Sequence, residues 1–327
     1  MELKKRSGPK VSIGLPVYNG QNFLEEALIS LLDQTYKDIE IIISDNQSTD
    51  RTNEICVDFV SRYPNIRYHR NETNMGAAFN YMKVLELSKG EYFKWAAHDD
   101  IISPTFIEKC VHVLDSEPDV ILCYSKAKII DEFGNVIVDH DPGPDLTNLG
   151  PHKRFKEFMF STYLNIQLSG LLRADILRKT NGYGKYPASD EILSGELSLY
   201  GKFFELPDRI FYVRMHKGQS TFGALIPGEN SIKFKQRDQI SWFNPNYEGK
   251  IILPTWLYYF EGLKAVTRSP ITPFQKMYCV FVLARRMLVW SHFKALGKDI
   301  YLAGKEIIFR LVAGNKKQDN FASLSRN

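Results

Sequence analysis

The sequence predicts an α/β protein with a mostly parallel central sheet, helices on both faces of that sheet and a helical C-terminal extension. Two observations predict this class. Runs of β-branched apolar residues alternate with amphipathic segments over about the first 125 residues, which is typical of a parallel sheet covered by helices. Of 327 residues, 44% are hydrophobic and 24% are charged, a globular composition with ample material for a core. This composition excludes a disordered chain and a low-complexity fibre.

The first half of the chain predicts strands and helices in regular order. Val11 to Leu15 alternates apolar with small or polar residues and predicts a strand that ends at Pro16. Asn22 predicts the cap of the following helix, with Glu25 completing a capping box. Further strands are expected at residues 39–44, 66–69, 92–97 and 120–124, and further helices at 52–62, at 76–87 and from Ser103-Pro104 onward.

Beyond residue 124 the pattern predicts mixed structure. Residues 128–138 read as a hairpin around Glu132–Asn135, and residues 139–151, rich in Asp, Pro and Gly, read as a surface loop. Helices are expected at 154–163 and 189–200, and strands at 167–172 and 210–215. From residue 231 onward the chain predicts amphipathic helices, around 254–267, 273–293 and 298–312. We therefore expect one domain over 1–230, with halves at about 11–125 and 126–230, and a basic helical region over 231–327.

Charge is unevenly distributed along the chain. Residues 1–231 hold 26 Lys and Arg against 32 Asp and Glu, a net charge of −6, whereas residues 232–327 hold 16 against 6, a net charge of +10. A basic tail on an acidic body suggests that the tail faces an anionic surface or substrate. Nucleic acid is a poor fit, because no recognition motif accompanies this charge.

The sequence predicts neither export nor membrane insertion. The N-terminus is basic without a following apolar run, so we expect no signal peptide, and no apolar stretch reaches the roughly 20 residues of a spanning helix. Four widely spaced cysteines without a CxxC pair predict neither a zinc knuckle nor a disulfide framework. These features favour a cytoplasmic protein.

Polar side chains follow the predicted parallel strands, at the edge where ligands bind in such sheets. Tyr18 follows the first strand and can present an aromatic surface to a nucleotide base, while Asp45 can accept a hydrogen bond from a base N–H. Asp99 and Asp100 follow the fourth strand and can bind a diphosphate through Mg²⁺ or Mn²⁺, which share carboxylate, phosphate and water ligands. Each cluster also has an ordinary use in turns and helix caps, so their convergence carries the prediction.

These clusters lie in segments that resemble the opening of the family 2 glycosyltransferases. These are nucleotide-sugar-dependent enzymes with the GT-A fold. The matching segments are VSIGLPVYNG at 11–20, QTY at 34–36 with IEIIISD at 39–45, STDRT at 48–52, NMG at 74–76 and FKWAAHDD at 93–100. The match is good over about residues 11–125, looser to 220 and absent beyond, and the combination of segments is specific although no single one is.

The resemblance implies a role for each matching position. Residues bordering the nucleotide would be Pro16, Tyr18, Asn19, Asp45, Asn74, Gly76 and Asp99. Asp99 and Asp100 fall where the metal-binding acidic motif belongs, and Asp45 would accept the N–H of uracil or thymine. Ala97 departs from the pattern, because many members have an acidic residue there. His98, inside the motif, is either a contact of the metal site or a residue satisfied by neighbouring backbone.

An inverting transfer needs a carboxylate base on the far side of the donor sugar. The family has a Glu-Asp pair in the region of Ser189-Asp190-Glu191, at the head of a predicted helix. We favour Asp190 as the base, with Glu191 as second choice. The alternative is that these carboxylates only interact with the helix dipole.

A second pair of candidates follows the strand predicted at 210–215. Arg-x-His segments in the family lie near the diphosphate and metal, which implies that His216 is a metal ligand or phosphate donor and that Arg214 binds phosphate. The alternative is that Arg214 pairs with a local acid.

The C-terminal helices mix aromatic residues with Lys and Arg. Either they pack on the catalytic domain and expose a solvated basic face, or they contact a membrane peripherally on its inner side, which would suit a lipid-linked acceptor.

The sequence thus predicts an inverting, metal-dependent transferase that moves sugar from a UDP- or dTDP-sugar to a cell-surface polysaccharide or lipid-linked glycan. Two alternatives remain: a nucleotide-sugar-binding protein without turnover, which Ala97 and the order Ser189-Asp190-Glu191 would suit, and a nucleotidyltransferase. The nucleotidyltransferase is disfavoured because Pro16-Val-Tyr-Asn19 is not a Gly-rich, basic phosphate loop.

Overall fold

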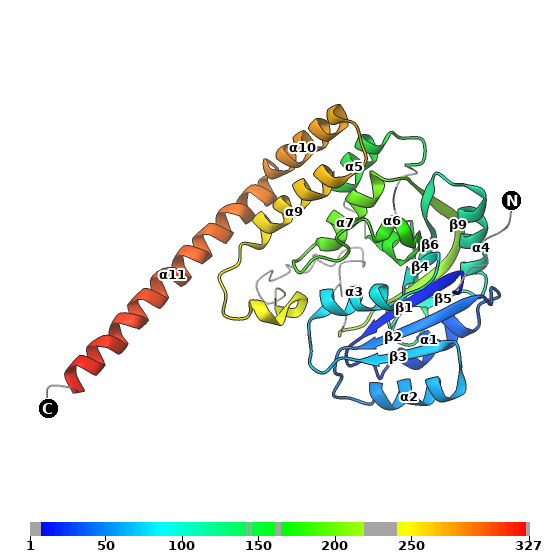
Figure 1. The fold of residues 1–327 in the computed structure, drawn as a ribbon, viewed down its shortest axis with the longest axis horizontal. Coiled ribbons are helices and arrows are strands. Elements are labelled where there is room, and N and C mark those ends of the chain that lie inside the picture. Colours follow the sequence, from blue (N-terminus) through cyan, green and yellow to red (C-terminus); the bar gives the residue numbers. More distant parts are fainter. Residues whose placement is uncertain (1–7, 142, 144–145, 161–164, 219–240, 325–327) are drawn as a thin grey trace.

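A computed structural model describes residues 8–141, 143, 146–160, 165–218 and 241–324, with side chains described as far as residue 311. Figure 1 shows a sheet with helices packed on both faces and a long C-terminal helix that projects from this body. Within the described residues, the sheet has nine strands in the order β3-β2-β1-β4-β8-β6-β9-β5, with β7 paired to β6 outside this path.

The strands and helices alternate through the first half of the chain. The strands are β1 (Val11–Val17), β2 (Ile39–Asp45), β3 (Ile66–Arg70), β4 (Tyr92–Trp95), β5 (Ile101–Ile102), β6 (Val120–Ile130), β7 (Val136–His140), β8 (Leu171–Arg173) and β9 (Lys202–Arg214). The α-helices are α1 (Leu24–Leu32), α2 (Thr52–Arg62), α3 (Ala77–Leu87), α4 (Phe106–Ser116), α5 (Pro151–Phe160), α6 (Ala174–Leu177), α7 (Ser189–Ser198), α9 (Pro254–Arg268), α10 (Pro273–Met287) and α11 (Trp290–Leu324). Short 3₁₀ helices are η1 (Ile166–Ser169) and η2 (Pro245–Tyr247).

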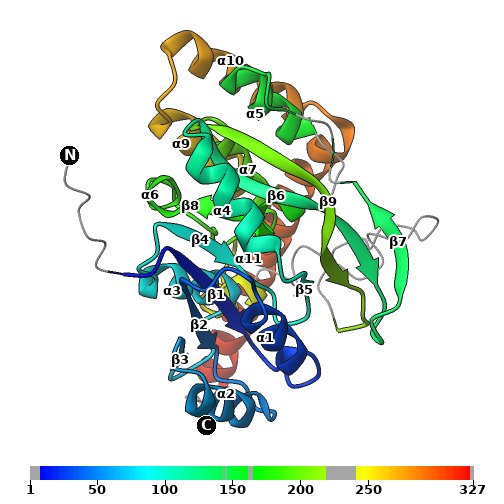
Figure 2. The same ribbon diagram turned by 90° about the vertical axis from the view of Figure 1, so that its right-hand side faces the viewer.

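The sheet is parallel in its first half and mixed beyond. β1 pairs in parallel with β2 and β4, and β2 pairs in parallel with β3. β8 joins β4 and β6 by antiparallel pairing, and β6 and β9 are again parallel. Figure 2 shows β6, β9 and β7 on the side of the sheet away from β3. The parallel strands end at one edge, and the polar loops that follow them meet there.

Alternating side chains of the buried strands feed two separate cores. Ile41 and Ile43 of β2 lie in one core with side chains of α1, α2 and α4. Ile42 points to the other core, which contains side chains of α3, α5, α7, α9 and α10. Because successive residues of a strand face opposite sides, a strand buried on both faces reads as a continuous apolar run. The predicted fold class is confirmed.

Several predicted boundaries are wrong for local reasons. β1 continues through Pro16 to Val17. Its pairing with β4 ends where the Ala96 N–H donates to the Gly14 carbonyl. Pro16 lies beyond that point, so its missing N–H leaves no acceptor of β4 without a hydrogen bond. Helix α1 begins at Leu24 without a side-chain cap, so Asn22 does not cap it. Similarly, α4 begins at Phe106, two residues beyond the predicted Ser103-Pro104.

The second half differs more from expectation. The strand predicted at 167–172 is the short helix η1 followed by β8. β6 is one strand where two were predicted, and β9 begins at Lys202 rather than Ile210. Pro207 lies in β9 where its register with β6 shifts between Leu206 and Arg209, and such an irregularity tolerates a residue that lacks an N–H.

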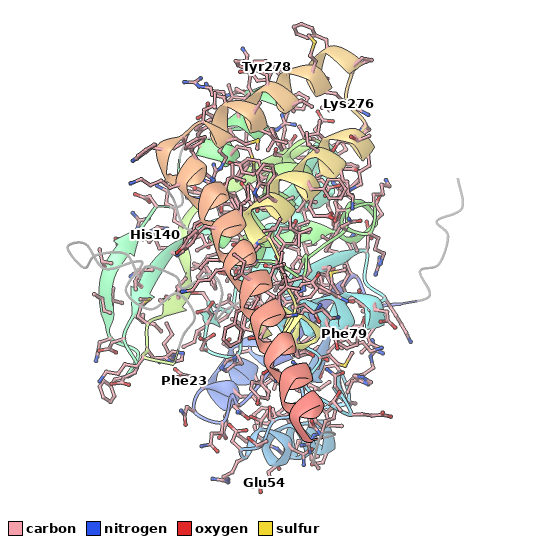
Figure 3. The ribbon with its side chains drawn as sticks, turned by 90° about the vertical axis from the view of Figure 1, so that its left-hand side faces the viewer. Phe23, Glu54, Phe79, His140, Lys276 and Tyr278 are labelled. Atoms are coloured by element: carbon pink, nitrogen blue, oxygen red, sulfur yellow. The ribbon has the colours of Figure 1, made fainter. Side chains whose placement is uncertain are left out.

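The C-terminal helices are continuous with the second core. Tyr258 and Ala265 of α9 and Val282 of α10 are buried in it. Figure 3 shows α10 and α11 along one side of the molecule. None of the described helices is long and apolar enough to cross a membrane. Parts of the predicted helix at 154–163 and of the region from 231 lie outside the described residues.

One lysine of the sheet is enclosed in the protein interior. Lys94 of β4 is 1% exposed, its Nζ lies 4.8 Å from the Phe106 ring centroid, and it donates a hydrogen bond to the Ser169 carbonyl. Burial lowers the pKa of Lys94 from 10.5 to about 8, against the opposing influence of Cys110 and Asp100. The folded protein therefore binds fewer protons than the unfolded chain between these two pH values.

Lys94→Met is expected to change the pH dependence of stability. The free energy of unfolding of the wild type rises as pH increases through this interval. The reason is that the unfolded chain binds a proton at Lys94 that the folded protein does not, so a higher pH disfavours the unfolded chain. The difference in unfolding free energy between Lys94→Met and wild type should therefore shrink by about 2 kcal/mol from pH ~7 to pH ~10. Urea unfolding at both pH values measures this difference. Lys185→Met, at an exposed position, is the control and should show no such change.

Candidate active site

A cavity of about 810 Å³ opens at the carboxyl ends of β1 and β4. Seven of the predicted site residues line it: Pro16, Tyr18, Asn19, Asn74, Asp99, Asp100 and His216. Asp45, Gly76, Asp190, Glu191 and Arg214 do not belong to its lining. The first group can touch a ligand in this cavity directly, whereas the second lies outside its lining.

Asn19 ties the loop after β1 to the loop after β2. It adopts a left-handed backbone conformation with φ of +53°. Its side-chain Oδ1 accepts the Thr49 N–H at 2.8 Å, and its own N–H donates to Ser48 Oγ at 2.8 Å. These bonds fix the loop on which Tyr18 stands with 44% of its surface exposed at the cavity. An aromatic face is thus available to a planar ligand group.

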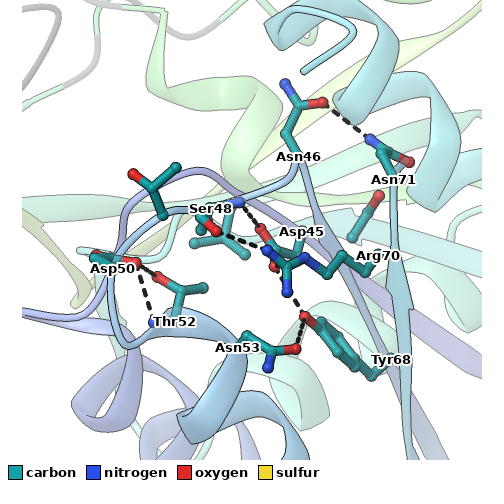
Figure 4. Close-up of polar contacts among 12 residues, drawn as sticks. Asp45, Asn46, Ser48, Asp50, Thr52, Asn53, Tyr68, Arg70 and Asn71 are labelled. Atoms are coloured by element: carbon teal, nitrogen blue, oxygen red, sulfur yellow. Dashed lines mark hydrogen bonds and ion pairs between the residues drawn. The ribbon is translucent and has the colours of Figure 1, made fainter. Parts of the chain in front are cut away.

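Asp45 holds the end of β2 together (Figure 4). Its carboxylate is fully buried and accepts the Ser48 N–H at 2.7 Å and the Tyr68 hydroxyl at 2.8 Å. Arg70 Nε lies 3.4 Å from the same carboxylate. Burial and the bond to Asp45 raise the pKa of Tyr68, so this phenol remains a donor. In this structure Asp45 shapes the loop, and its contact with a base remains a prediction.

Asn46, which sequence reasoning did not single out, lines the cavity beside Asp45. Its amide nitrogen donates to Asn74 Oδ1 at 2.7 Å. Its Oδ1 accepts from Asn71 Nδ2 at 2.9 Å and from the Met75 N–H at 3.0 Å (Figure 4 shows the bond to Asn71). Asn46 therefore orients Asn74 and the turn that precedes α3.

Gly76 allows the C-terminal region to approach the cavity. Its φ is +85°, and a Cβ atom there would lie 2.6 Å from the carbonyl oxygen of Phe243 and 2.7 Å from Cδ of Pro245. The same segment brings Trp242 and Pro245 into the cavity lining. The need for glycine at this predicted nucleotide-binding position follows from a close backbone approach.

Gly76→Ala is expected to displace the segment 241–245. The left-handed backbone and the overlap with Phe243 together should lower the free energy of unfolding by about 2 kcal/mol or more. Gly134→Ala is a matched control, because Gly134 has a φ of +88° but no atom within 4 Å of the added Cβ. Urea unfolding and limited proteolysis at 241–245 measure the effect. Equal destabilisation by both variants would show that the close approach is unimportant.

Asp99 and Asp100 stand at the cavity with fixed orientations. The Asp99 carboxylate Oδ2 lies 3.0 Å from His216 Nε2, and Asp100 Oδ1 accepts a hydrogen bond from the backbone N–H of Arg214 at 3.0 Å. His216 is itself packed against Phe23, with ring centroids 4.7 Å apart. Both carboxylates are therefore positioned by β9 and the residues that follow it.

The two neighbouring carboxylates differ in proton affinity. Burial raises the pKa of Asp99, but the hydrogen bond from His216 and the nearby His98 outweigh it, so the net shift is downward. Burial and the adjacent Asp99 charge raise the pKa of Asp100 well above its usual value. Two buried like charges so close together repel each other, and a cation between them would relieve this repulsion.

The residues fit a divalent cation held by two carboxylates rather than a site built from protein alone. Among the described residues, no three His, Cys, Asp or Glu side chains gather so as to hold a metal. Mg²⁺ typically takes one or two carboxylates and completes its shell with phosphate and water oxygens, a pattern that Asp99 and Asp100 can meet. His216 bonds to Asp99 and so orients that carboxylate, as partners of metal ligands commonly do.

Arg214 adopts the alternative role expected for it, pairing with a local acid. Its guanidinium is 1% exposed and donates to Glu26 Oε2 at 2.6 Å and to the Asp99 carbonyl at 3.0 Å. It also donates to the carbonyls of Asp131 and Glu132, at 3.3 and 3.2 Å. The Arg214 guanidinium, bonded to these acceptors, holds the loops around the acidic pair. A phosphate group could bind Arg214 only by replacing one of these acceptors.

Tyr81 is a partly buried phenol at the cavity that is influenced by several carboxylates. It lines the cavity, and its ring lies 4.6 Å from that of Tyr183, centroid to centroid. Burial and the charges of Asp99, Asp100 and Asp190 raise the pKa of Tyr81. The head of α7 and the acidic pair thus both influence a phenol that lines the cavity.

Asp190 has the environment of a proton acceptor. Burial raises its pKa above 3.8, against hydrogen bonds that lower it. Asn165 donates to the Asp190 carbonyl at 2.8 Å and accepts from Ser194 Oγ at 2.8 Å, which anchors the first turn of α7. A carboxylate whose pKa lies nearer to neutrality is a stronger base than an exposed one.

Glu191 faces a different cavity. This second cavity, of about 200 Å³, lies between α7 and helices α9 and α11, and Tyr258 and His292 also line it. Arg286 Nη2 of α10 lies 2.5 Å from Glu191 Oε1. Burial raises the pKa of Glu191 to about 7, although the Arg286 charge opposes this. Glu191 thus joins α7 to the C-terminal helices, and the assignment of the base to Asp190 or Glu191 stays a prediction.

Comparison with known proteins identifies what this site resembles. The profile of glycosyl transferase family 2 matches residues 12–180. An uncharacterized glycosyltransferase of Rickettsia prowazekii is 30% identical over 228 residues, which cover 66% of this chain and 67% of that protein. Another, of Rickettsia typhi, is 39% identical over 126 residues. Three rickettsial relatives are matched over only 38%, 21% and 20% of their own length.

Solved structures share the fold at low sequence identity. TarS 1–349 of S. aureus, in complex with UDP, superposes with a TM-score of 0.59 at 16% identity, covering 87% of this chain and 73% of that one. The mannosyltransferase PcManGT of Pyrobaculum calidifontis, in complex with GDP-Man and Mn²⁺, gives 0.54 at 14% identity, covering 98% and 81%. The architecture is the GT-A fold expected from the sequence.

Proposed function

Since the chain belongs to glycosyl transferase family 2 and has the GT-A fold, we propose that it transfers a sugar from a nucleotide-sugar donor to an acceptor hydroxyl. One observation carries this proposal. An 810 Å³ cavity at the carboxyl ends of the parallel strands holds an aromatic face, Tyr18, and an acidic pair, Asp99 and Asp100. A nucleotide-sugar needs both features in one site: the aromatic face for its nucleobase, and the acidic pair for the cation that binds its diphosphate.

The donor is proposed to be a UDP- or dTDP-sugar. Tyr18 would stack on the nucleobase, and Asp45 would accept a hydrogen bond from the uracil or thymine N–H. The other residues that would border the nucleotide are Pro16, Asn19, Asn74, Gly76 and Asp99. One structural neighbour was solved with UDP and another with GDP-Man, so these neighbours do not select one nucleobase. The proposal of uracil or thymine depends on the residues of this site. Asp99 and Asp100 would hold Mg²⁺ or Mn²⁺, which stabilises negative charge on the departing diphosphate.

The reaction is proposed to invert the anomeric centre. The acceptor oxygen attacks the anomeric carbon from the face opposite the diphosphate, and the bond from that carbon to the diphosphate oxygen breaks. Asp190, whose pKa burial raises, takes the proton of the acceptor hydroxyl as the new bond forms. His216 and Arg214 keep Asp99 and Asp100 in place throughout.

The acceptor is proposed to be a cell-surface polysaccharide or a lipid-linked glycan, and the protein to act in the cytoplasm or on the inner face of the membrane. Residues 1–230 would form the catalytic domain and residues 231–327 a helical region attached to it. The pairing of Glu191 with Arg286 supports a fixed attachment between the two.

Nucleoside diphosphate release tests the proposal. With Mn²⁺ and a panel of glycan acceptors, a UDP- or dTDP-sugar should release its diphosphate, and the same nucleotide should raise the melting temperature. Melting shifts with UDP, dTDP and GDP compared side by side identify the base. Binding without release for every acceptor would favour a nucleotide-sugar-binding protein, for which Ala97 in the cavity lining is the motivating departure. Pyrophosphate release would indicate a nucleotidyltransferase.

A further inference from the structure

Large apolar side chains lie exposed along one face of α11. Trp290, Phe293, Tyr301, Ile308 and Leu311 are between 56% and 68% exposed. Their spacing of three, eight, seven and three residues places them on a single stripe of an α-helix. We call these five residues the α11 apolar face. Soluble surfaces rarely carry so continuous an apolar stripe without a partner.

The opposite side of α11 is anchored to the protein, which fixes the direction of this face. Leu296 and Asp299 are 6% and 7% exposed. Asp299 Oδ2 accepts the Thr255 N–H of α9 at 2.7 Å, and Trp256 Nε1 donates to the Leu296 carbonyl at 3.2 Å. Near the start of α11 the apolar face therefore points away from the body, and the rest of the helix projects from that body (Figure 1). In Figure 3 α11 lies in front of the rest of the molecule.

Lysines border the α11 apolar face along one edge. Lys294, Lys298 and Lys305 are exposed and follow one another by four and seven residues, so they share a side of the helix. The Lys294 ammonium lies 4.6 Å from the centroid of the Trp290 ring. Residues 232–327 carry a net charge of +10, so the region as a whole attracts anions.

Helix α10 also carries exposed apolar side chains. Phe274, Met277 and Phe281 are 68%, 64% and 63% exposed and recur at steps of three and four residues. The C-terminal helices thus expose apolar side chains where a solvated basic face was the expected alternative. A stripe of aromatic and aliphatic residues with a lysine edge is typical of a helix that lies in the plane of a membrane interface.

We propose that the α11 apolar face docks on the surface of a bilayer that contains anionic lipid. Trp290, Phe293 and Ile308 enter the boundary between headgroups and acyl chains, and the lysine edge binds the anionic headgroups. The partner is a lipid surface rather than a second copy of the chain, because a copy would present the same lysines and repel them. Service to a lipid-linked acceptor rests on the proposed function, but the docking itself does not.

Co-sedimentation with vesicles tests this docking on the full chain. Wild type should pellet with phosphatidylcholine vesicles that contain phosphatidylglycerol. Pelleting should weaken at ~1 M salt, where the Debye length falls to about 3 Å and the attraction between lysines and headgroups is screened. The double variant Phe293→Glu/Ile308→Glu should reduce the partition coefficient at least about tenfold, and Lys294→Glu/Lys298→Glu should remove the preference for phosphatidylglycerol. Circular dichroism confirms that each variant folds.

Two matched controls accompany these variants. Phe133→Glu changes a side chain that is 81% exposed in the β6–β7 hairpin, and Lys185→Glu changes an exposed lysine elsewhere; neither should alter pelleting. Wild type that stays in the supernatant, or equal pelleting of Phe293→Glu/Ile308→Glu, overturns the proposal. So does a wild-type dimer that this double variant converts to a monomer while vesicle binding is absent.

The docking and the proposed function fail separately. Melting-temperature shifts with UDP report the nucleotide site and should be the same for wild type and the α11 variants. Loss of vesicle binding with an intact UDP shift removes only the membrane partner. Vesicle binding without any nucleotide shift removes only the proposed transferase.

Discussion

Replacing Asp100 with asparagine is expected to remove the metal-dependent part of nucleotide binding. The amide keeps the oxygen that accepts the Arg214 N–H at 3.0 Å, so the loop should retain its shape. The negative charge that a divalent cation requires is lost. Since loss of a mere partner of a metal ligand costs about 10- to 100-fold in metal affinity, loss of a ligand should cost at least about 100-fold.

Calorimetric titration of UDP measures this effect in Mn²⁺ and in EDTA. Wild type should bind more tightly with Mn²⁺, whereas Asp100→Asn should bind with the same weak affinity in both. Asp119→Asn, with a side chain that is 79% exposed, is the control and should behave as wild type. An Mn²⁺ enhancement that survives in Asp100→Asn would take Asp100 out of the metal site.

The sequence identified the parallel half of the sheet because its strands are buried on both faces. Ile41, Ile42 and Ile43 feed two different cores, so this strand reads as an uninterrupted apolar run. Strand β9 was mostly missed because its exposed side chains and Pro207 interrupt such a run. Its partner β6 lies about 80 residues earlier in the chain, so no local pattern could reveal the pairing.

In the site, too, residues that follow a strand could be predicted from the sequence, whereas residues brought in from distant segments could not. Asp99 and Asp100 were predictable because they directly follow a strand whose end faces the cavity. Trp242 also lines the cavity, yet it comes from a segment that reaches the site only through the close approach at Gly76. The sequence contained no signal for this approach beyond the glycine itself.

The different surroundings of the two carboxylates at the head of α7 became visible only with coordinates. Adjacent residues of a helix differ by about 100° in direction, so Asp190 and Glu191 face different surroundings. Asp190 acts on Tyr81 together with the acidic pair, whereas Glu191 pairs with Arg286 across a separate cavity. Arg286 comes from a helix about a hundred residues later, which sequence pattern could not relate to α7.

Asp190→Asn is therefore expected to lower turnover by at least about 100-fold while leaving donor affinity unchanged, in line with loss of a general base. The asparagine fills the same volume but cannot take the acceptor proton. Because burial raises the pKa of Asp190, wild-type kcat/KM should fall on the acid side as this carboxylate becomes protonated. The residual activity of Asp190→Asn should lack that acid limb.

Glu191→Gln is the matched control, one residue away on the same helix. It leaves Arg286 buried without its charge partner, so at pH ~9, where Glu191 is ionised, the free energy of unfolding should fall by about 3 kcal/mol. Turnover per folded molecule should change by less than about tenfold, and the acid limb of the pH profile should remain. The opposite result, with full turnover in Asp190→Asn and an abolished acid limb in Glu191→Gln, would transfer the base to Glu191. That outcome would mean that the acceptor reaches the sugar through the cavity between α7 and the C-terminal helices.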